Sequence, residues 1–247
     1  WKAGGAASSN TDGTITSSVS ANTTYGFSVV TYTGNTSAGA TVGHGLSSDP
    51  KFVLVKCRNS GEPWVAFHTS TGNTVGMRLT TAAADSGYNW WNSTTPSSTV
   101  FTIGNTGAVN NANTYVAYVW SEVANFSKFG SYTGTSSTVT VTTGFKPRYV
   151  LVKNTSGAYD WVVVDSARSN ADAKLFPNTS AAESAQDAFD FNDDGFTIKV
   201  VDWPMNKNGD TFIYAAFAAK PDGSVIDSLV DTPTNAATPT DTGAGGE

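Results

Sequence analysis

The residues best suited to chemistry in this sequence begin with the stretch "YNWWNST", Tyr88 to Thr94. Aromatic rings with polar flanks suit stacking on a sugar ring, but they equally suit contact with a partner subunit or a place in the core. Adjacent strand residues point to opposite faces, so at least one indole is expected to be exposed or at an interface. The hypothesis is a shallow glycan site, in which Trp90 or Trp91 stacks on the sugar and Asn89 or Asn92 bonds its hydroxyls.

A second candidate is the acidic stretch "DFNDDG", Asp190 to Gly195. It matches the opening of a calcium loop, with Asp190, Asn192 and Asp194 as possible oxygen ligands. The bidentate acid expected at the twelfth position is missing, because Val201 occupies it. A tight hairpin turn at the end of the stretch explains most of the same pattern. Calcium therefore stays open beside the turn, and no other cofactor is expected.

Motifs for catalysis are sparse. Nucleophilic catalysis needs a base beside the nucleophile, and the only histidines are His44, between glycines, and His68, on an apolar strand. A turn role and a core role are the favoured interpretations. Glycosidases use two carboxylates about 5 to 10 Å apart, but Asp160 and Asp165 bracket a strand and are expected to face opposite ways. We expect no enzymatic activity; a polysaccharide-degrading enzyme is the less favoured alternative.

Composition narrows the classes of protein further. Charged residues make up 14% of the 247 residues, against about 25% in an average soluble protein, and Thr, Ser, Asn and Gly replace them. The net charge is −6 and no basic run is present, so nucleic-acid binding is not expected. Cys57 is the only cysteine, which excludes an internal disulfide. No apolar stretch approaches the roughly 20 residues of a membrane helix, so no membrane insertion is expected.

The sequence also repeats itself. "FVLVK" at Phe52 to Lys56 returns as "YVLVK" at Tyr149 to Lys153, 97 residues later. Four further pairs occur in the same order in both copies, at offsets of 95 to 100 residues: "YTGN" with "YTGT" before this strand, and "PWVAFHTS" with "DWVVVDSA", "VFTIGN" with "GFTIKV" and "NTYVAYVWSE" with "DTFIYAAFAA" after it. Ordered blocks at one offset indicate an internal duplication. Trp64 then aligns with Trp161, and Tyr115 with Phe212.

Each copy consists of short runs rich in Val, Ile, Phe, Tyr and Thr between turn residues, which is typical of β-strands. Strands are predicted near 27–33, 40–43, 51–58, 63–69, 76–81, 99–104 and 114–123, then near 126–133, 137–143, 148–154, 160–166, 187–191, 195–201 and 211–219. The predicted fold is all-β, with two tandem duplicated antiparallel β-sandwiches of jelly-roll type. They span residues 26–124 and 125–220, with extended linkers at 1–25 and 221–247.

The repeated strand is apolar on both faces. Phe52 and Leu54 point one way, and Val53 and Val55 the other. A sheet with one face in water should alternate apolar and polar residues. One face must therefore pack in its own sandwich, while the sister copy or another chain covers the opposite face. We expect the copies to meet through strands 114–123 and 211–219.

The combination of "VGHGL", "DPKFVLVK", "NTYVAYVWSEV", "FSKFGSYTG" and "TFIYAAFA" resembles an uncharacterised duplicated β domain of large tail-fibre-like proteins of marine bacteriophages. The resemblance covers roughly residues 1–247 and transfers no catalytic or binding residue. It implies a structural module of a virion appendage that contributes to host adhesion, located on the virion or outside the cell. It also implies a homotrimer with neighbouring virion domains as partners. The alternative function is a lectin-like, receptor-binding domain whose partner is a host surface glycan.

Overall fold

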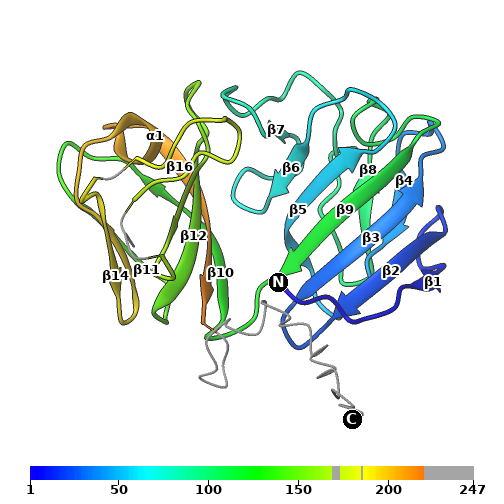
Figure 1. The fold of residues 1–247 in the computed structure, drawn as a ribbon. Helices are drawn as coiled ribbons and strands as arrows, with labels where there is room; N and C mark the ends of the chain where they lie inside the picture. Colours follow the sequence, from blue (N-terminus) through cyan, green and yellow to red (C-terminus); the bar gives the residue numbers. More distant parts are fainter. Residues whose placement is uncertain (169–172, 185, 220–247) are drawn as a thin grey trace, which may run out of the picture.

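The structure is a computed structural model that describes residues 1–168, 173–184 and 186–219 (Figure 1). These residues form sixteen strands and one four-residue helix. The strands are β1 (Ser8–Asn10), β2 (Ser17–Asn22), β3 (Phe27–Thr33), β4 (Ala40–Gly43), β5 (Pro50–Cys57), β6 (Val65–His68), β7 (Met77–Arg78), β8 (Val100–Ile103), β9 (Thr114–Ser121), β10 (Ser127–Thr133), β11 (Val139–Thr142), β12 (Pro147–Asn154), β13 (Val162–Asp165), β14 (Phe189–Asn192), β15 (Gly195–Ile198) and β16 (Thr211–Ala218). The helix is α1 (Trp203–Asn206). The predicted all-β class is confirmed, and the paired strands of the sheets are antiparallel.

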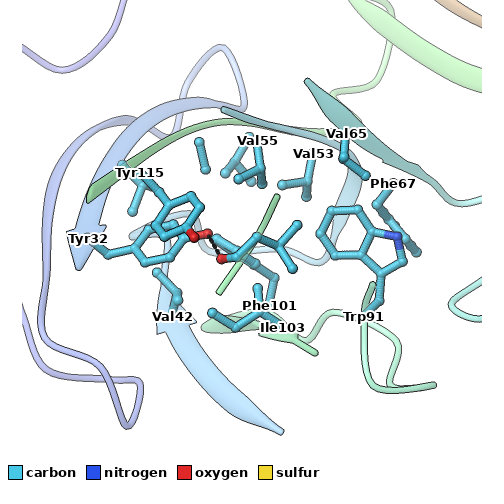
Figure 2. Packing of buried hydrophobic residues seen from close by; sticks show 14 of the residues in the cluster. Tyr32, Val42, Val53, Val55, Val65, Phe67, Trp91, Phe101, Ile103 and Tyr115 are labelled. Atoms are coloured by element: carbon cyan, nitrogen blue, oxygen red, sulfur yellow. Dashed lines mark hydrogen bonds between the residues drawn. The ribbon is translucent and has the colours of Figure 1, made fainter. Parts of the chain in front are cut away.

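The first half of the chain packs two sheets in a sandwich-like arrangement. A seven-stranded sheet has the order β1-β2-β3-β9-β5-β6-β7, and β4 pairs with β8 in a small second sheet. Alternate residues of β5, Val53 and Val55, point into the core between them and are fully buried. Figure 2 shows this core, with Phe101 and Ile103 of the small sheet below those valines and Tyr115 at one end.

The second half has a four-stranded sheet, β10-β16-β12-β13, and a three-stranded sheet, β11-β15-β14. Its core again takes alternate residues from the central strands, such as Val150 and Val152 of β12, and adds Phe196 and Ile198 of β15. Helix α1 contributes the buried Met205. No helix in the part of the chain that the structure describes is long and apolar enough to cross a membrane.

The strand orders of the two halves correspond. The order β3-β9-β5-β6 in the first half has its counterpart in β10-β16-β12-β13 in the second. The registers correspond too, because Phe52 lies opposite His68 and Tyr149 lies opposite Asp165. The register also shifts just after Pro50 and just after Pro147.

A third core lies between the halves. The outward residues of β5 and β9, including Phe52 and Trp120, pack with outward residues of β16, including Ile213 and Phe217. Figure 1 shows the sheet of β10, β12 and β16 between its own partner sheet and the first half. The strands that are apolar on both faces are thus covered within this chain. The contact includes β9 and β16, the two segments that the sequence predicted to meet.

The N-terminal segment corrects a prediction. Residues 1–25 were expected to be an extended linker, but β1 and β2 extend the seven-stranded sheet at its edge. Ile15 and Val19 reach the first core, and the Ser17 hydroxyl donates a hydrogen bond to the Gly43 carbonyl (2.9 Å). These strands carry small hydroxyl side chains and gain their order from main-chain pairing, so they lack the apolar signature of a strand. The predicted linker at 221–247 lies outside the described residues.

Candidate functional site

The two tryptophans of "YNWWNST" are core residues. Trp90 and Trp91 are 3% and 2% exposed, so the hypothesis that either stacks on a sugar is wrong. The Trp91 indole N–H donates to the Val75 carbonyl (3.0 Å), and its ring meets the edge of Phe67 (Figure 2). The Trp90 N–H donates to the Asp85 carbonyl (3.3 Å). The 88–94 segment is an irregular loop rather than a strand, so adjacent residues need not face opposite ways.

Tyr88 is the aromatic residue of this loop that faces solvent, with 52% of its surface exposed. Its ring lies 4.9 Å from the Trp90 ring, centroid to centroid, and the Arg78 guanidinium carbon lies 5.0 Å from its centroid. Arg78 also forms a salt bridge with Asp85 (3.2 Å). The buried tryptophan and the paired arginine therefore fix the position of a ring that remains open to solvent.

A hollow of about 350 Å³ lies beside this ring. The residues that line it include Asn73, Ser86, Tyr88, Asn89, Asn92 and Ser93. The Asn89 amide nitrogen donates to the Asn92 amide oxygen (3.2 Å), so the structure brings the two predicted asparagines together. Asn92 and Ser93 adopt left-handed backbone conformations, with φ of 50° and 49°. Two such residues in a row turn the loop sharply where it lines the hollow.

Two of the three predicted calcium ligands have partners within the protein. Asp190 and Asn192 lie on β14, and Asp194 lies in the two-residue turn to β15. The Asp190 carboxylate pairs with Lys199 (2.8 Å), and the Asn192 amide donates to the Thr197 hydroxyl (2.9 Å). Within the ranges that the structure describes, no group of three or more His, Cys, Asp or Glu side chains is placed to hold a metal ion. The pattern is that of a hairpin turn, because alternating strand residues find partners along the hairpin.

Both histidines are buried, and main-chain groups occupy all their ring nitrogens. His44 Nδ1 accepts the Leu46 N–H (3.1 Å), and its Nε2 lies 3.1 Å from the Ser97 carbonyl. His68 Nδ1 accepts the Ser70 N–H (3.1 Å), and its Nε2 lies 3.0 Å from the Tyr214 carbonyl. These partners require a neutral ring that is protonated on Nε2. Burial lowers the pKa of both rings, that of His68 to about 4.

The hydrogen bond between His68 and the Tyr214 carbonyl joins the two halves, and further polar contacts do the same. The Trp161 indole N–H donates to the Arg78 carbonyl (3.0 Å), and the Ala84 N–H donates to the Thr155 carbonyl (3.2 Å). The ammonium of the buried Lys153 donates to the Tyr159 carbonyl and to the Thr81 carbonyl (3.4 Å).

Sequence reasoning missed the role of Lys153. Its burial lowers the pKa to about 8, and its ammonium also lies 5.9 Å from the Trp161 ring centroid. The sequence feature that could have revealed this role is a lysine after the apolar run "VLV" in both copies. The Lys56 ammonium donates to the Glu62 carbonyl, as Lys153 does to the Tyr159 carbonyl.

The fold and these sites define an all-β, sandwich-like protein. It has a buried contact between its halves and a surface hollow beside the exposed ring of Tyr88. The chain belongs to the family of a domain of unknown function, DUF7483, whose model matches residues 1–221. This match spans both halves and the N-terminal strands. No curated protein matches the chain, and no solved structure does.

Proposed function

We propose that this chain is a rigid structural module of an extracellular fibre or other virion appendage, built from two duplicated sandwiches that are fused back to back. The observation that carries the proposal is the third core. Phe52, Trp120, Ile213 and Phe217 are each 6% exposed or less, although they lie on the outward faces of their sheets. Burying such large apolar side chains stabilises the contact by about 1.5–3 kcal/mol each, so the halves are not free to swing on a hinge.

Repeated buried contacts support the duplication. The Tyr32 hydroxyl donates to the Val109 carbonyl (2.7 Å), and the Tyr132 hydroxyl donates to the Met205 carbonyl (2.6 Å). In each half a buried asparagine follows that carbonyl by one residue. Its oxygen accepts a main-chain N–H of the loop after the first central strand, that of Asn35 (2.8 Å) in one half and Thr135 (2.7 Å) in the other. A buried polar network helps to specify one particular fold. Its recurrence in both halves, in the same order along the chain, favours a common ancestor for the halves.

The association with an appendage rests on composition and resemblance. A low charge fraction and a surface rich in Thr, Ser and Asn suit a component of an extracellular assembly. The similarity to tail-fibre-like phage proteins adds the virion, the neighbouring domains and a homotrimer. The apolar outer faces no longer argue for the trimer, because the chain covers them itself. Light scattering on the purified chain is the measurement for the trimer.

The functional proposal is tested on particles that carry the full-length protein. Antibodies raised against this segment are expected to label a fibre or spike in negatively stained electron micrographs. The same antibodies should not label particles in which the segment has been deleted from the gene. Label that never coincides with an appendage, or protein recovered only free in the medium, would contradict the structural role.

A further inference from the structure

We propose that the hollow beside Tyr88 binds a neutral saccharide, with the Tyr88 ring against one face of a sugar and the Asn89 and Asn92 amides on its hydroxyls. Four large apolar residues in the described part of the chain are exposed, namely Trp1, Tyr88, Val201 and Trp203. Of these, Tyr88 lines the hollow described above. The site goes beyond the structural role, since a rigid module can have such a site or lack it.

The aromatic platform is already fixed. Trp90 holds one side of Tyr88 and is itself anchored by its hydrogen bond to the Asp85 carbonyl. Gly76 makes room for that anchor, because a Cβ at Gly76 would lie 2.5 Å from the Trp90 ring. Arg78 lies over both rings and is held by Asp85. A ring that is ordered before binding loses little conformational entropy on binding, which raises affinity for a weak ligand.

The polar groups around the platform are available to a ligand. The amide bond between Asn89 and Asn92 uses one N–H and one oxygen, and it leaves the Asn89 oxygen and the Asn92 nitrogen without a hydrogen-bond partner among the described residues. The hydroxyls of Ser86, Tyr88 and Ser93 are likewise without one there. A sugar ring presents apolar C–H groups on its face and hydroxyls at its edge. An aromatic ring bordered by free amides and hydroxyls complements both.

The charge and size of the hollow select the class of ligand. None of the described residues that line it is charged, and Arg78 and Asp85 nearby neutralise each other. A phosphate or a uronic acid would find no counter-charge in the lining. The volume of about 350 Å³ lies near the lower end of the usual range for ligand sites, about 300–1,000 Å³. One or two neutral sugar units fit this description.

The test is saturation-transfer NMR on the intact 247-residue chain with the methyl glycosides of glucose, galactose, mannose and N-acetylglucosamine. The wild-type protein is expected to transfer saturation to at least one of them. Tyr88→Ala should weaken that binding about fivefold or more, because it removes a stacked ring. Tyr88→Phe should retain most of it, and Asn89→Ala should weaken it. Tyr88 and Asn89 are exposed, so these variants should melt like the wild type.

Trp203→Ala is the matched control, since Trp203 is 61% exposed but lies on α1 in the other half. It should leave sugar binding unchanged. The proposal is overturned if the wild type binds none of the four glycosides, if binding survives Tyr88→Ala, or if Trp203→Ala abolishes it. None of these results bears on where antibodies label the appendage, so the two proposals fail separately.

Discussion

At the scale of single residues, buried polar side chains hold the loops and the contact between the halves. His68 is the clearest case, because it is 1% exposed and bonds main-chain groups from both halves. A proton on its Nδ1 would break the bond from the Ser70 N–H and leave a buried charge. The fold therefore depends on a neutral imidazole.

This dependence predicts an acid-sensitive fold. The His68 pKa falls from its usual value of 6.5 to about 4 in the folded protein, so the unfolded protein binds more protons between these values. The contribution of neutral His68 to the free energy of unfolding should be fully present above pH 6.5. It should fall by about 3 kcal/mol as the pH drops to 4. In His68→Gln this contribution should vanish, as measured by urea unfolding across that range. The difference between variant and wild type isolates it from His44, whose pKa is also lowered. Equal pH slopes for the two proteins would refute the assignment.

Asn110 gives a second prediction at the same scale. Its amide oxygen accepts the N–H groups of Asn35 (2.8 Å) and Thr36 (3.2 Å), and its nitrogen donates to the Ser37 and Gly104 carbonyls (2.8 Å each). Asn110→Ala would strand several of these groups, so we expect a loss of about 3 kcal/mol or more in the free energy of unfolding. Asn111→Ala, at an exposed neighbour, is the control and should change it by less than about 1 kcal/mol. Chemical denaturation measures both, and similar losses in the two variants would contradict the account.

At the scale of elements, the β14–β15 hairpin gives the acidic stretch its structural role. The ladder runs from Phe189–Ile198 to Asn192–Gly195, so the turn residues are Asp193 and Asp194. The carbonyl of Asp194 accepts the N–H of Thr143 (2.8 Å), which ties the turn to the neighbouring β11.

A chelator should accordingly leave the hairpin intact. We expect the melting temperature to be the same in excess EDTA and in millimolar calcium, as followed by circular dichroism. Asp190→Asn serves as the companion variant and should likewise show no calcium response. A rise of several degrees with calcium that disappears in this variant would restore the calcium site.

The accuracy of the sequence-based prediction differed between elements, because different interactions stabilise them. Strands with large apolar side chains, such as β5 and β12, were predicted within about two residues, because burial dictates their composition. Strands β1 and β2 were missed, since main-chain pairing forms them and their serines resemble a linker. The tryptophan loop was assigned the wrong orientation, because contacts with Val75 and Phe67, distant in the sequence, determine which way each indole points. The asparagines of the hollow were identified, but the exposed ring beside them was not.

At the scale of the whole molecule, the contact between the halves is the central feature. Trp161 is 1% exposed and anchors one side of it through the bond to the Arg78 carbonyl. Trp161→Ala should lower the free energy of unfolding by about 3–5 kcal/mol. Trp64→Ala, at the corresponding place before β6, should cost clearly less because Trp64 is only partly buried. Equal losses in urea unfolding would argue against a special role for the contact.

Differential scanning calorimetry tests the contact most directly. The wild-type chain is predicted to unfold in one transition, with equal calorimetric and van't Hoff enthalpies, because neither half can open without exposing the third core. Ala215→Glu places a charge in that core, where Ala215 is 3% exposed, and should split the trace into two transitions. Thr211→Glu, at an exposed position of the same strand, should keep a single one. Two separate transitions in the wild type, or a single unshifted transition in Ala215→Glu, would contradict the claim that the halves form one rigid unit.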